Sequence, residues 1–450
     1  MSNSSRSLEQ WLHRLEQLHP TEIDLGLERI GVVARHAGLM QGLPPIITVG
    51  GTNGKGSVVE YLLRCLEAAG LKTGAYTSPH LFRFNERIRV GGTEVDDASL
   101  IGAFEAIEQA RVTAGDAAVT LTYFEFSTLA AMQLFRASEL DVIILEVGLG
   151  GRLDAANLWD ASCAVITSIG IDHEEWLGSD REFIAAEKVA IARTGHPLVI
   201  GERQRPASMD NFAGDNDIPC YRLGEEFDVQ RHENGFTWQR SAALEDTLLP
   251  AQLELPLPGL AGPHQLDNAA IAVCTLQLLP DFTALPAIGS EAIASGLKQA
   301  EVIGRMQQLS IHGQRILLDV AHNPAAAEVL AGTLQQNYPD ESCIAVFAIM
   351  QDKDVDSVVD RVAPFVKQWH CAGLDIPRAL NPADAASMIK LHYPRVEVLE
   401  FADVGAALLA ACDGVAQADS AVKNDQPTYV MVFGSFFTVG AALETAQLVD

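Results

Sequence analysis

Short apolar runs alternate with helical patterns along the first half of the chain. The runs are rich in β-branched residues and lie at Ile46–Val49, Asp141–Val147, Ala164–Ile169 and Pro197–Ile200. Apolar positions at helical spacing predict a helix that Ser7 caps and Pro20 ends, and another over 58–69 that ends at Gly70. Strands that are apolar on both faces and alternate with helices indicate a parallel sheet covered on both sides.

A second series of the same kind occupies the C-terminal third of the chain. Its strands are expected at Arg315–Val320, Cys343–Ala348, Val396–Leu399 and Tyr429–Phe433. Between the two series, residues 203–260 are polar and hold short alternating pieces, which predict small antiparallel strands. A helix is expected at 267–279 and a polar loop at 416–426.

The length of 450 residues is too great for one ordinary core. The segment 299–304 separates the two α/β series, so we expect a larger domain over residues 1–300 and a smaller α/β domain over 301–450. The larger domain would combine a mostly parallel sheet with the small antiparallel one.

The charge balance excludes one class of partner. Asp and Glu number 59 against 31 Lys and Arg, a net charge of −28, whereas nucleic-acid binding needs clustered cations. An anionic substrate must therefore be attracted by a local positive feature. Seven scattered cysteines, a polar start from Met1 to Ser7 and the lack of a long apolar run favour a cytoplasmic protein with no membrane span.

A glycine-rich segment follows the first strand and opens the helix behind it. Its residues are Gly51, Thr52, Asn53, Gly54, Lys55, Gly56 and Ser57. Strand, glycine loop, lysine and helix in this order are typical of a phosphate-binding loop, in which Lys55 neutralises phosphates and Ser57 reaches Mg²⁺. Gly56 stands between Lys and Ser, unlike the usual spacing, and a simple glycine-rich turn is the alternative.

Acidic and imidazole groups follow two other strands of the first series. Glu146 closes one strand, and Asp172 and His173 follow the next. Carboxyl ends of parallel strands are where such folds bind ligands, and a carboxylate suits Mg²⁺. His173 is a less usual Mg²⁺ ligand, and a loop histidine bonded to the backbone is the alternative.

Four further positions are ambiguous from the residues alone. Lys188 lies on a helical stretch and is typical of a solvated helix lysine. The segment 148–154 forms a tight turn or brings Arg152 and Asp154 to the sheet edge near Glu146. Arg305 has the permanent charge and planar fork that suit phosphate binding, and a surface arginine without a ligand is the alternative.

Taken in order, these segments resemble the Mur-ligase superfamily and, within it, the bacterial dihydrofolate synthase/folylpolyglutamate synthase family. The motifs that carry the resemblance are Gly51–Ser57, Thr77–Leu81, Glu86–Ile88, Leu121–Glu125, Glu146–Asp154, Asp172–His173, Glu187–Lys188, Gly262–Ala269, Gly304–Arg305 and Asp319–Pro324. The resemblance covers residues 24–440 and implies a P-loop ATPase domain followed by a Rossmann-like domain that binds glutamate. We also expect a monomer.

The resemblance further implies an ATP site with two Mg²⁺ ions. Ser57 or Ser78, with Glu146, would hold the first ion; Glu146, His173 and Lys188 would serve the second. In the family this lysine is carbamylated, which turns an ammonium into an oxygen-bearing anion. Residues that match the family's nucleotide contacts are Asn268, Arg305 and Asp319.

Other matched positions imply the two substrates that are joined. The family's dihydropteroate pocket matches Thr122, Tyr123, Phe124, Glu125, Arg152 and Asp154, and its glutamate site matches His322 and Ser435. The implied reaction is ATP-dependent ligation of L-glutamate to dihydropteroate and to reduced folates such as tetrahydrofolate, through an acyl phosphate. Two departures from the family's pattern, Ala156 and Ala348, bear only on the detail of the pterin pocket.

Three alternatives remain open at this stage. A monofunctional folylpolyglutamate synthase would lack activity on dihydropteroate. Another Mur-type amide ligase shares the chemistry, but the 122–125 segment and the lack of an extra N-terminal substrate domain disfavour it. A non-enzymatic nucleotide-binding module would need no second metal site.

Overall fold

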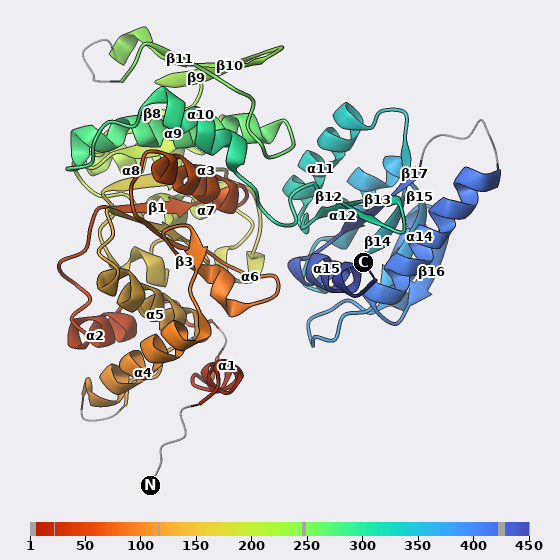
Figure 1. The fold of residues 1–450 in the computed structure, drawn as a ribbon, viewed down its shortest axis with the longest axis horizontal. Coiled ribbons are helices and arrows are strands. Elements are labelled where there is room, and N and C mark those ends of the chain that lie inside the picture. The colour runs from red at the N-terminus through yellow and green to blue at the C-terminus, as the bar shows by residue number, and fades with distance from the viewer. Residues whose placement is uncertain (1–5, 22, 116–117, 245–248, 422–427, 450) are drawn as a thin grey trace. The chain divides into compact units, whose positions relative to one another are not determined.

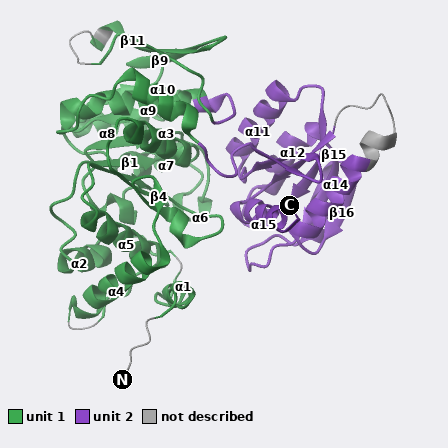
Figure 2. Ribbon diagram, viewed as in Figure 1, with its two compact units in different colours: residues 1–259, 266–300 green, residues 260–265, 301–450 purple. Residues whose placement is uncertain are grey.

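The computed structural model describes residues 6–21, 23–115, 118–244, 249–421 and 428–449. The chain divides into two compact units (Figure 2). Unit 1 comprises residues 1–259 and 266–300, and unit 2 comprises residues 260–265 and 301–450. Each unit has its own sheet and its own hydrophobic core.

Unit 1 is built on an eight-stranded, mostly parallel sheet. Its strands, in spatial order, are β4 (Thr93–Glu94), β3 (Ile88–Val90), β2 (Thr73–Tyr76), β5 (Val142–Glu146), β1 (Ile46–Gly50), β6 (Cys163–Ile166), β7 (Leu198–Ile200) and β8 (Cys220–Arg222). Only β3 and β4, at one edge, run antiparallel to their neighbours. The central strands β1, β5 and β6 are buried along their whole length, as their apolar sequences predict.

Helices cover both faces of this sheet (Figure 1). They are α1 (Leu8–Glu16), α2 (Glu28–His36), α3 (Lys55–Ala68), α4 (Asp97–Thr113), α5 (Tyr123–Ala137), α6 (Glu174–Leu177), α7 (Arg181–Val189), α8 (Ala207–Asp215), α9 (His264–Phe282) and α10 (Ser290–Gln299), with 3₁₀ turns at Phe84–Arg87, Ala155–Leu158 and Ala242–Leu244. Helix α1 begins with the predicted capping box, in which Ser7 and Gln10 satisfy each other's backbone N–H groups.

A separate three-stranded antiparallel sheet completes unit 1. It consists of β9 (Phe227–His232), β10 (Gly235–Arg240) and β11 (Gln252–Leu255), in the polar region where small antiparallel strands were predicted. Strand β8 of the same region is different, because it pairs in parallel with β7 in the main sheet. Phe227 and Trp238 stack beneath the small sheet with ring centroids 6.0 Å apart.

Unit 2 has a six-stranded sheet. Its order is β12 (Gln307–Ile311), β13 (Gln314–Asp319), β17 (Thr428–Phe433), β14 (Ser342–Phe347), β15 (Val366–Ala372) and β16 (Glu397–Phe401), and only β12 is antiparallel. Its helices are α11 (Pro324–Asn337), α12 (Val355–Val362), α13 (Pro382–His392), α14 (Val404–Ala421) and α15 (Phe436–Val449), with a 3₁₀ turn at Ala363–Phe365. The predicted parallel α/β architecture is confirmed in both units.

The predicted loop at 416–426 is wrong in its first part. Residues 416–421 continue α14, whose alanine-rich sequence supports a helix although it lacks a strong apolar stripe. The remaining residues, 422–426, lie outside the described part, as does the start of the polar N-terminal segment, Met1–Ser5. Within the described ranges, no helix is long and apolar enough to cross a membrane.

Candidate active site

The carboxyl ends of three central strands meet at one edge of the unit 1 sheet. Strand β1 lies between β5 and β6, and all three are parallel. The glycine-rich loop leaves β1, Glu146 is the last residue of β5, and the segment 167–173 follows β6. The sequence-predicted groups therefore share the edge at which open α/β sheets bind ligands.

The glycine-rich loop passes so close to its neighbours that two positions admit no side chain. Gly51 has φ +141°, and a Cβ there would overlap the hydroxyl of Thr167. Gly54 has φ +87°, and a Cβ there would lie 2.8 Å from Asn268 Oδ1. Both glycines serve a backbone conformation and a close approach that other residues cannot provide.

Hydrogen bonds tie this loop to the segment after β6. The backbone N–H of Thr52 donates to Ser168 O (2.7 Å), and the N–H of Asn53 donates to Ser168 Oγ (3.1 Å). Thr167 Oγ1 donates to Asn53 O (2.6 Å), and Thr52 Oγ1 donates to Gly170 O (3.0 Å). These hydrogen bonds fix the shape of the loop.

Two lysine amines converge on one carbonyl of this loop. Lys55 Nζ donates to Gly51 O (3.0 Å) and Thr52 O (3.0 Å), and Lys188 Nζ donates to Gly51 O (3.2 Å). Lys188 is only 6% exposed. Burial, together with the nearby Lys55 charge, lowers the pKa of Lys188 to about 7. Lys188 is therefore no solvated helix lysine, whatever its helical sequence context suggests.

The acidic groups at this edge are held by backbone contacts. Glu146 is 5% exposed, and its Oε2 accepts a hydrogen bond from the N–H of Ser78 (3.1 Å), so the structure brings these two predicted metal ligands together. His173 is exposed and has φ +54° at the start of α6, where its N–H donates to Asp172 Oδ1 (2.8 Å).

The donor set at this edge suits a nucleotide with Mg²⁺. Asn268 lies close against Gly54, and α3 begins at Lys55 with its first N–H groups and with the buried hydroxyl of Ser57. Hydroxyl and carboxylate oxygens from Ser57, Ser78 and Glu146 are hard ligands of the kind that Mg²⁺ prefers. Among the described residues, no three His, Cys, Asp or Glu side chains gather into a metal cluster.

The predicted pterin segment forms the start of α5. Thr122 and Glu125 make a capping box: Thr122 N–H donates to Glu125 Oε2 (2.7 Å), and Glu125 N–H donates to Thr122 Oγ1 (3.2 Å). Arg29 also donates to Glu125 Oε1 (3.1 Å). Burial raises the pKa of Glu125 above its usual value. Tyr123, the first residue of the helix, lies under the Arg87 guanidinium at 5.5 Å.

The Phe124 ring packs directly against the backbone of Gly148. A Cβ at Gly148 would lie 2.7 Å from the Phe124 ring, and the ring also packs on Tyr76 with centroids 5.7 Å apart. Asp154 organises the same turn, because its Oδ2 accepts from the N–H groups of Gly148 (3.1 Å) and Leu149 (2.8 Å). Burial raises the pKa of Asp154 to about 6.

Arg152 lies on the same turn but points to a helix. Its Nε and Nη2 atoms contact Glu187 Oε1 at 3.0 and 2.8 Å, and its side chain is 57% exposed. Glu187 directly precedes Lys188 on α7, so Arg152 contacts the residue next to Lys188.

Unit 2 gathers its own predicted residues after β13. Asp319 accepts from the N–H groups of Met306 (3.0 Å) and Ala321 (2.9 Å), and burial raises its pKa although the Arg305 charge opposes this. The Arg305 guanidinium lies 5.7 Å from the Phe436 ring, and the His322 ring lies 6.1 Å from it. His322 Nδ1 bonds Val320 O (2.8 Å), and because a carbonyl only accepts, Nδ1 carries the proton.

Ser435 has a structural task in addition to any binding role. Its Oγ accepts from the N–H of Thr438 (3.0 Å) at the start of α15, and Thr438 Oγ1 donates to Ala348 O (2.6 Å). Ser435 is therefore buried at the carboxyl end of β17, next to β13 and β14 in the sheet.

Sequence reasoning gave no role to several residues that shape these sites. Thr167 and Ser168 hold the phosphate loop, yet nothing in their strand-end context distinguishes them. Phe436 and His264 lie near Arg305 in unit 2, and burial with the Arg305 charge lowers the pKa of His264 to about 4. The local signals are Gly262 and Pro263 before His264 and the aromatic pair after Ser435.

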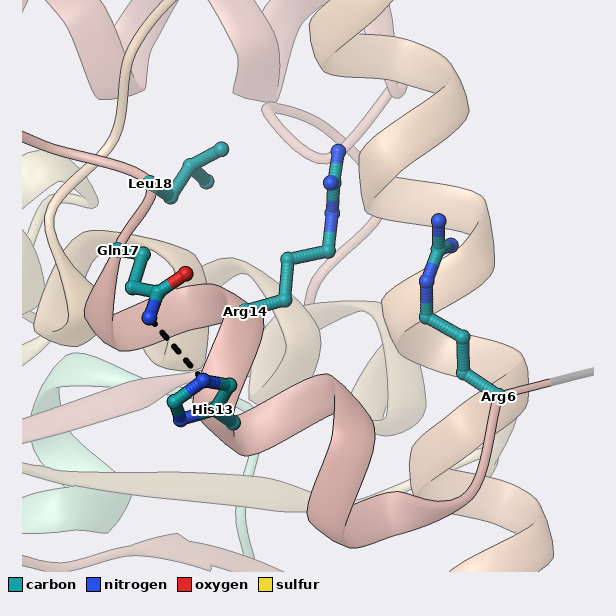
Figure 3. Close-up of a pocket in the computed structure, with 5 residues that line it drawn as sticks. All are labelled: Arg6, His13, Arg14, Gln17 and Leu18. Atoms are coloured by element: carbon teal, nitrogen blue, oxygen red, sulfur yellow. Dashed lines mark hydrogen bonds between the residues drawn. The ribbon is translucent and has the colours of Figure 1, made fainter.

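A shallow hollow on unit 1 contains none of the predicted site residues. It is lined by Arg6, His13, Arg14, Gln17 and Leu18 (Figure 3). The side chain of Gln17 bonds His13 Nε2 at 3.0 Å, as the dashed line in Figure 3 shows. The hollow belongs to α1 and the residues around it.

Comparison with known proteins supplies independent information. Residues 49–276 match the Mur ligase middle domain, and residues 304–436 match the Mur ligase glutamate ligase domain. A dihydrofolate synthase/folylpolyglutamate synthase of Escherichia coli strain K12 is 39% identical over 441 residues, 97% of this chain and 95% of that protein.

Two solved structures are similar over their full length. Escherichia coli FolC in complex with DHPP and ADP is 36% identical, with a TM-score of 0.86, over 100% of this chain and 99% of that one. A bifunctional folylpolyglutamate synthase/dihydrofolate synthase with Mn, AMPPNP and L-glutamate bound is 39% identical, with a TM-score of 0.84, over 99% of each chain.

Proposed function

The chain belongs to the Mur ligase family, and we propose that it joins L-glutamate to dihydropteroate, giving dihydrofolate, and to reduced folates, giving folylpolyglutamates. The reaction consumes ATP and passes through an acyl phosphate. The convergence of Lys55 and Lys188 on Gly51 O carries this proposal, because a plain phosphate loop needs only one lysine. The ligands of the two similar structures, DHPP, ADP, AMPPNP, manganese and glutamate, support it.

The phosphate loop would bind and orient ATP. Backbone N–H groups at the start of α3 and the Lys55 ammonium would stabilise the charge of the transferring phosphoryl group. Two Mg²⁺ ions, when bound, would neutralise phosphate charge. Residues that would hold them are Ser57, Ser78, Glu146, His173 and Lys188. The acceptor's carboxylate would take the terminal phosphoryl group of ATP, and ADP would leave. The glutamate amine would then attack the resulting acyl phosphate, and phosphate would leave as the amide bond forms.

Lys188 would act as a carbamate. Carbamate formation joins a neutral amine to CO₂ and releases a proton. A buried amine beside another lysine is neutral more often than a normal lysine at neutral pH. The product carries hard oxygens in place of a charge that repels Mg²⁺. Lys188→Ala should lose activity, and acetate or propionate should restore part of it. Full activity without additive would contradict the proposal.

The turn at 148–154 and the start of α5 would bind the pterin end of the acceptor, with Phe124 as its aromatic surface and Asp154 keeping the turn in shape. Unit 2 would bind the amino acid and contact the nucleotide. Arg305 would contact the nucleotide and His322 would contact the glutamate, and both side chains lie beside the Phe436 ring.

We expect a cytoplasmic monomer that acts on small molecules and binds no nucleic acid. Seven free cysteines fit a reducing compartment, and the net charge of −28 disfavours nucleic acid as a partner.

The decisive experiment measures ADP release with dihydropteroate and with tetrahydrofolate as separate acceptors, each with and without L-glutamate. Mass analysis of the products counts the glutamates added. We expect glutamate-dependent ADP release and one or more added glutamates with both acceptors. Turnover of tetrahydrofolate alone would favour the monofunctional enzyme, and ATP binding without ADP release would favour a nucleotide-binding module.

A further inference from the structure

The last turn of α7 is held at a fixed distance from the phosphate loop. Lys188 Nζ reaches Gly51 O (3.2 Å) through a four-carbon side chain, which has many rotamers of similar energy. The direction of such a side chain is reproducible only where its backbone is held. The structure holds this backbone from one side, through the turn that follows β5.

Gly151 packs directly on the α7 backbone. A Cβ at this position would lie 2.6 Å from Glu187 O and 2.9 Å from the Cα of Lys188. The next residue adds a hydrogen bond, because the N–H of Arg152 donates to Glu187 O (2.9 Å). Two consecutive residues of the turn therefore contact the peptide group that joins Glu187 to Lys188.

The Arg152 side chain makes a second contact with α7, in addition to the backbone hydrogen bond. Its Nε and Nη2 atoms both bind Glu187 Oε1, and Glu187 is only 14% exposed. A pair with so exposed an arginine contributes little to stability. Two donors on one oxygen do, however, fix the orientation of the two partners.

The turn itself is rigid and continues from a predicted metal ligand. Arg152 lies six positions after Glu146 along the chain, and Asp154 accepts hydrogen bonds from two N–H groups at the start of the turn. Asn157 Nδ2 donates to Arg152 O (2.9 Å) and holds its other end. A continuous path therefore runs from Glu146 through Arg152 and Glu187 to Lys188.

We propose that Arg152 is a positioning residue which, through Glu187, sets the separation of Glu146 and Lys188 and so shapes the second metal site. This inference rests on the proposed function for the role of Lys188. It gives Arg152 a different role from the acceptor contact that the family resemblance implies. Gly151 serves the same purpose by letting the two backbones touch.

The test counts bound Mn²⁺ by electron paramagnetic resonance on the full chain with AMPPNP, which needs no turnover. We expect the wild type to bind two ions. Arg152→Ala should weaken the second ion about tenfold and leave the first unchanged, and Glu187→Gln should do the same. Arg152→Lys, which keeps the charge without the planar fork, should recover part of the affinity.

Kinetics on the same variants separates the two roles of Arg152. A positioning role predicts a lower kcat that excess Mg²⁺ partly restores, with an unchanged KM for dihydropteroate. Unchanged Mn²⁺ binding would overturn the proposal. If the KM for dihydropteroate then rises, Arg152 is an acceptor contact. If that KM also stays the same, the Arg152–Glu187 pair is a surface ion pair without a role in the site.

The matched control is Arg14→Ala, which removes a comparable ion pair between Arg14 on α1 and Glu108 on α4 (2.5 Å). The Arg14→Ala variant should still bind both Mn²⁺ ions. If it loses an ion, the loss of any surface ion pair weakens Mn²⁺ binding, and the proposal is overturned. Failure of the proposed function is distinguishable, because the wild type itself would then release no ADP with either acceptor. Gly151→Ala should act in the same direction as Arg152→Ala, and the arginine variants decide the question if Gly151→Ala does not fold.

Discussion

The two predicted sites are built by different means. In unit 1 the phosphate loop lies so close to the side chains of Thr167 and Asn268 that Gly51 and Gly54 leave no space for a Cβ. In unit 2 the predicted groups follow a strand end and are held by a helix cap at Ser435 and by ring contacts of Phe436. Substitutions that add atoms should therefore disrupt the unit 1 site, and substitutions that remove a hydrogen bond should disrupt the unit 2 site.

The largest effect is expected for Lys55→Ala. Removing the phosphate-pairing charge should cost about 3 kcal/mol of transition-state stabilisation, or roughly 10²–10³ in kcat, as the loss of a single preorganised donor does. Steady-state ADP release at saturating ATP measures it. Exposed Lys298 provides the control, since Lys298→Ala should keep normal turnover. Near-normal turnover of Lys55→Ala would contradict the phosphate-loop assignment.

Two glycines of the same loop sharpen the comparison. Gly51→Ala forces an alanine to φ +141° and into Thr167, so the free energy of unfolding should fall by about 3 kcal/mol. Gly56 lies in α3 with no neighbour near its Cβ position, and Gly56→Ala should raise stability by up to ~1 kcal/mol. Urea unfolding measures both. Equal effects would show that the loop is not sterically locked.

In unit 2, Ser435→Ala removes a helix cap and a predicted glutamate contact. We expect a stability loss of about 1 kcal/mol from the lost cap, together with a higher KM for L-glutamate. Asn381→Ala is the matched control, because Asn381 caps α13 of the same unit and has no predicted substrate role. An unchanged KM in both variants would reduce Ser435 to a capping residue.

The smallest effect concerns His264. Its pKa is lowered to about 4, so the folded state disfavours the protonated ring, and stability is lost as pH falls from 6.5 toward 4. Among the described residues, none hydrogen-bonds its buried Nδ1 atom. Relative to His264→Gln, the wild type should lose under about 1 kcal/mol between pH 8 and pH 6. Parallel pH profiles of unfolding for the two proteins would contradict this.

Features with a local signature were predictable from the sequence. The apolar strands β1, β5 and β17, the glycine-rich loop and strand-end Glu146 all follow from neighbouring residues. Strand β15 was missed because its sequence carries Lys367, Gln368 and His370 among apolar residues, and tertiary packing decides its state. The burial of Lys188 was equally out of reach, since it depends on Gly51, 137 positions away.

The division of the chain into units constrains the order of folding. Residues 260–265 belong to unit 2, yet residues 266–300, with most of α9 and all of α10, return to unit 1. Helix α10 packs on α3, and Gly296 lies against the backbone of Cys65. During synthesis, unit 1 therefore cannot close its core until residue 300 has emerged, well after its main sheet is made. A cleavage at residue 300 would also divide unit 2, leaving His264 on the other fragment from Arg305.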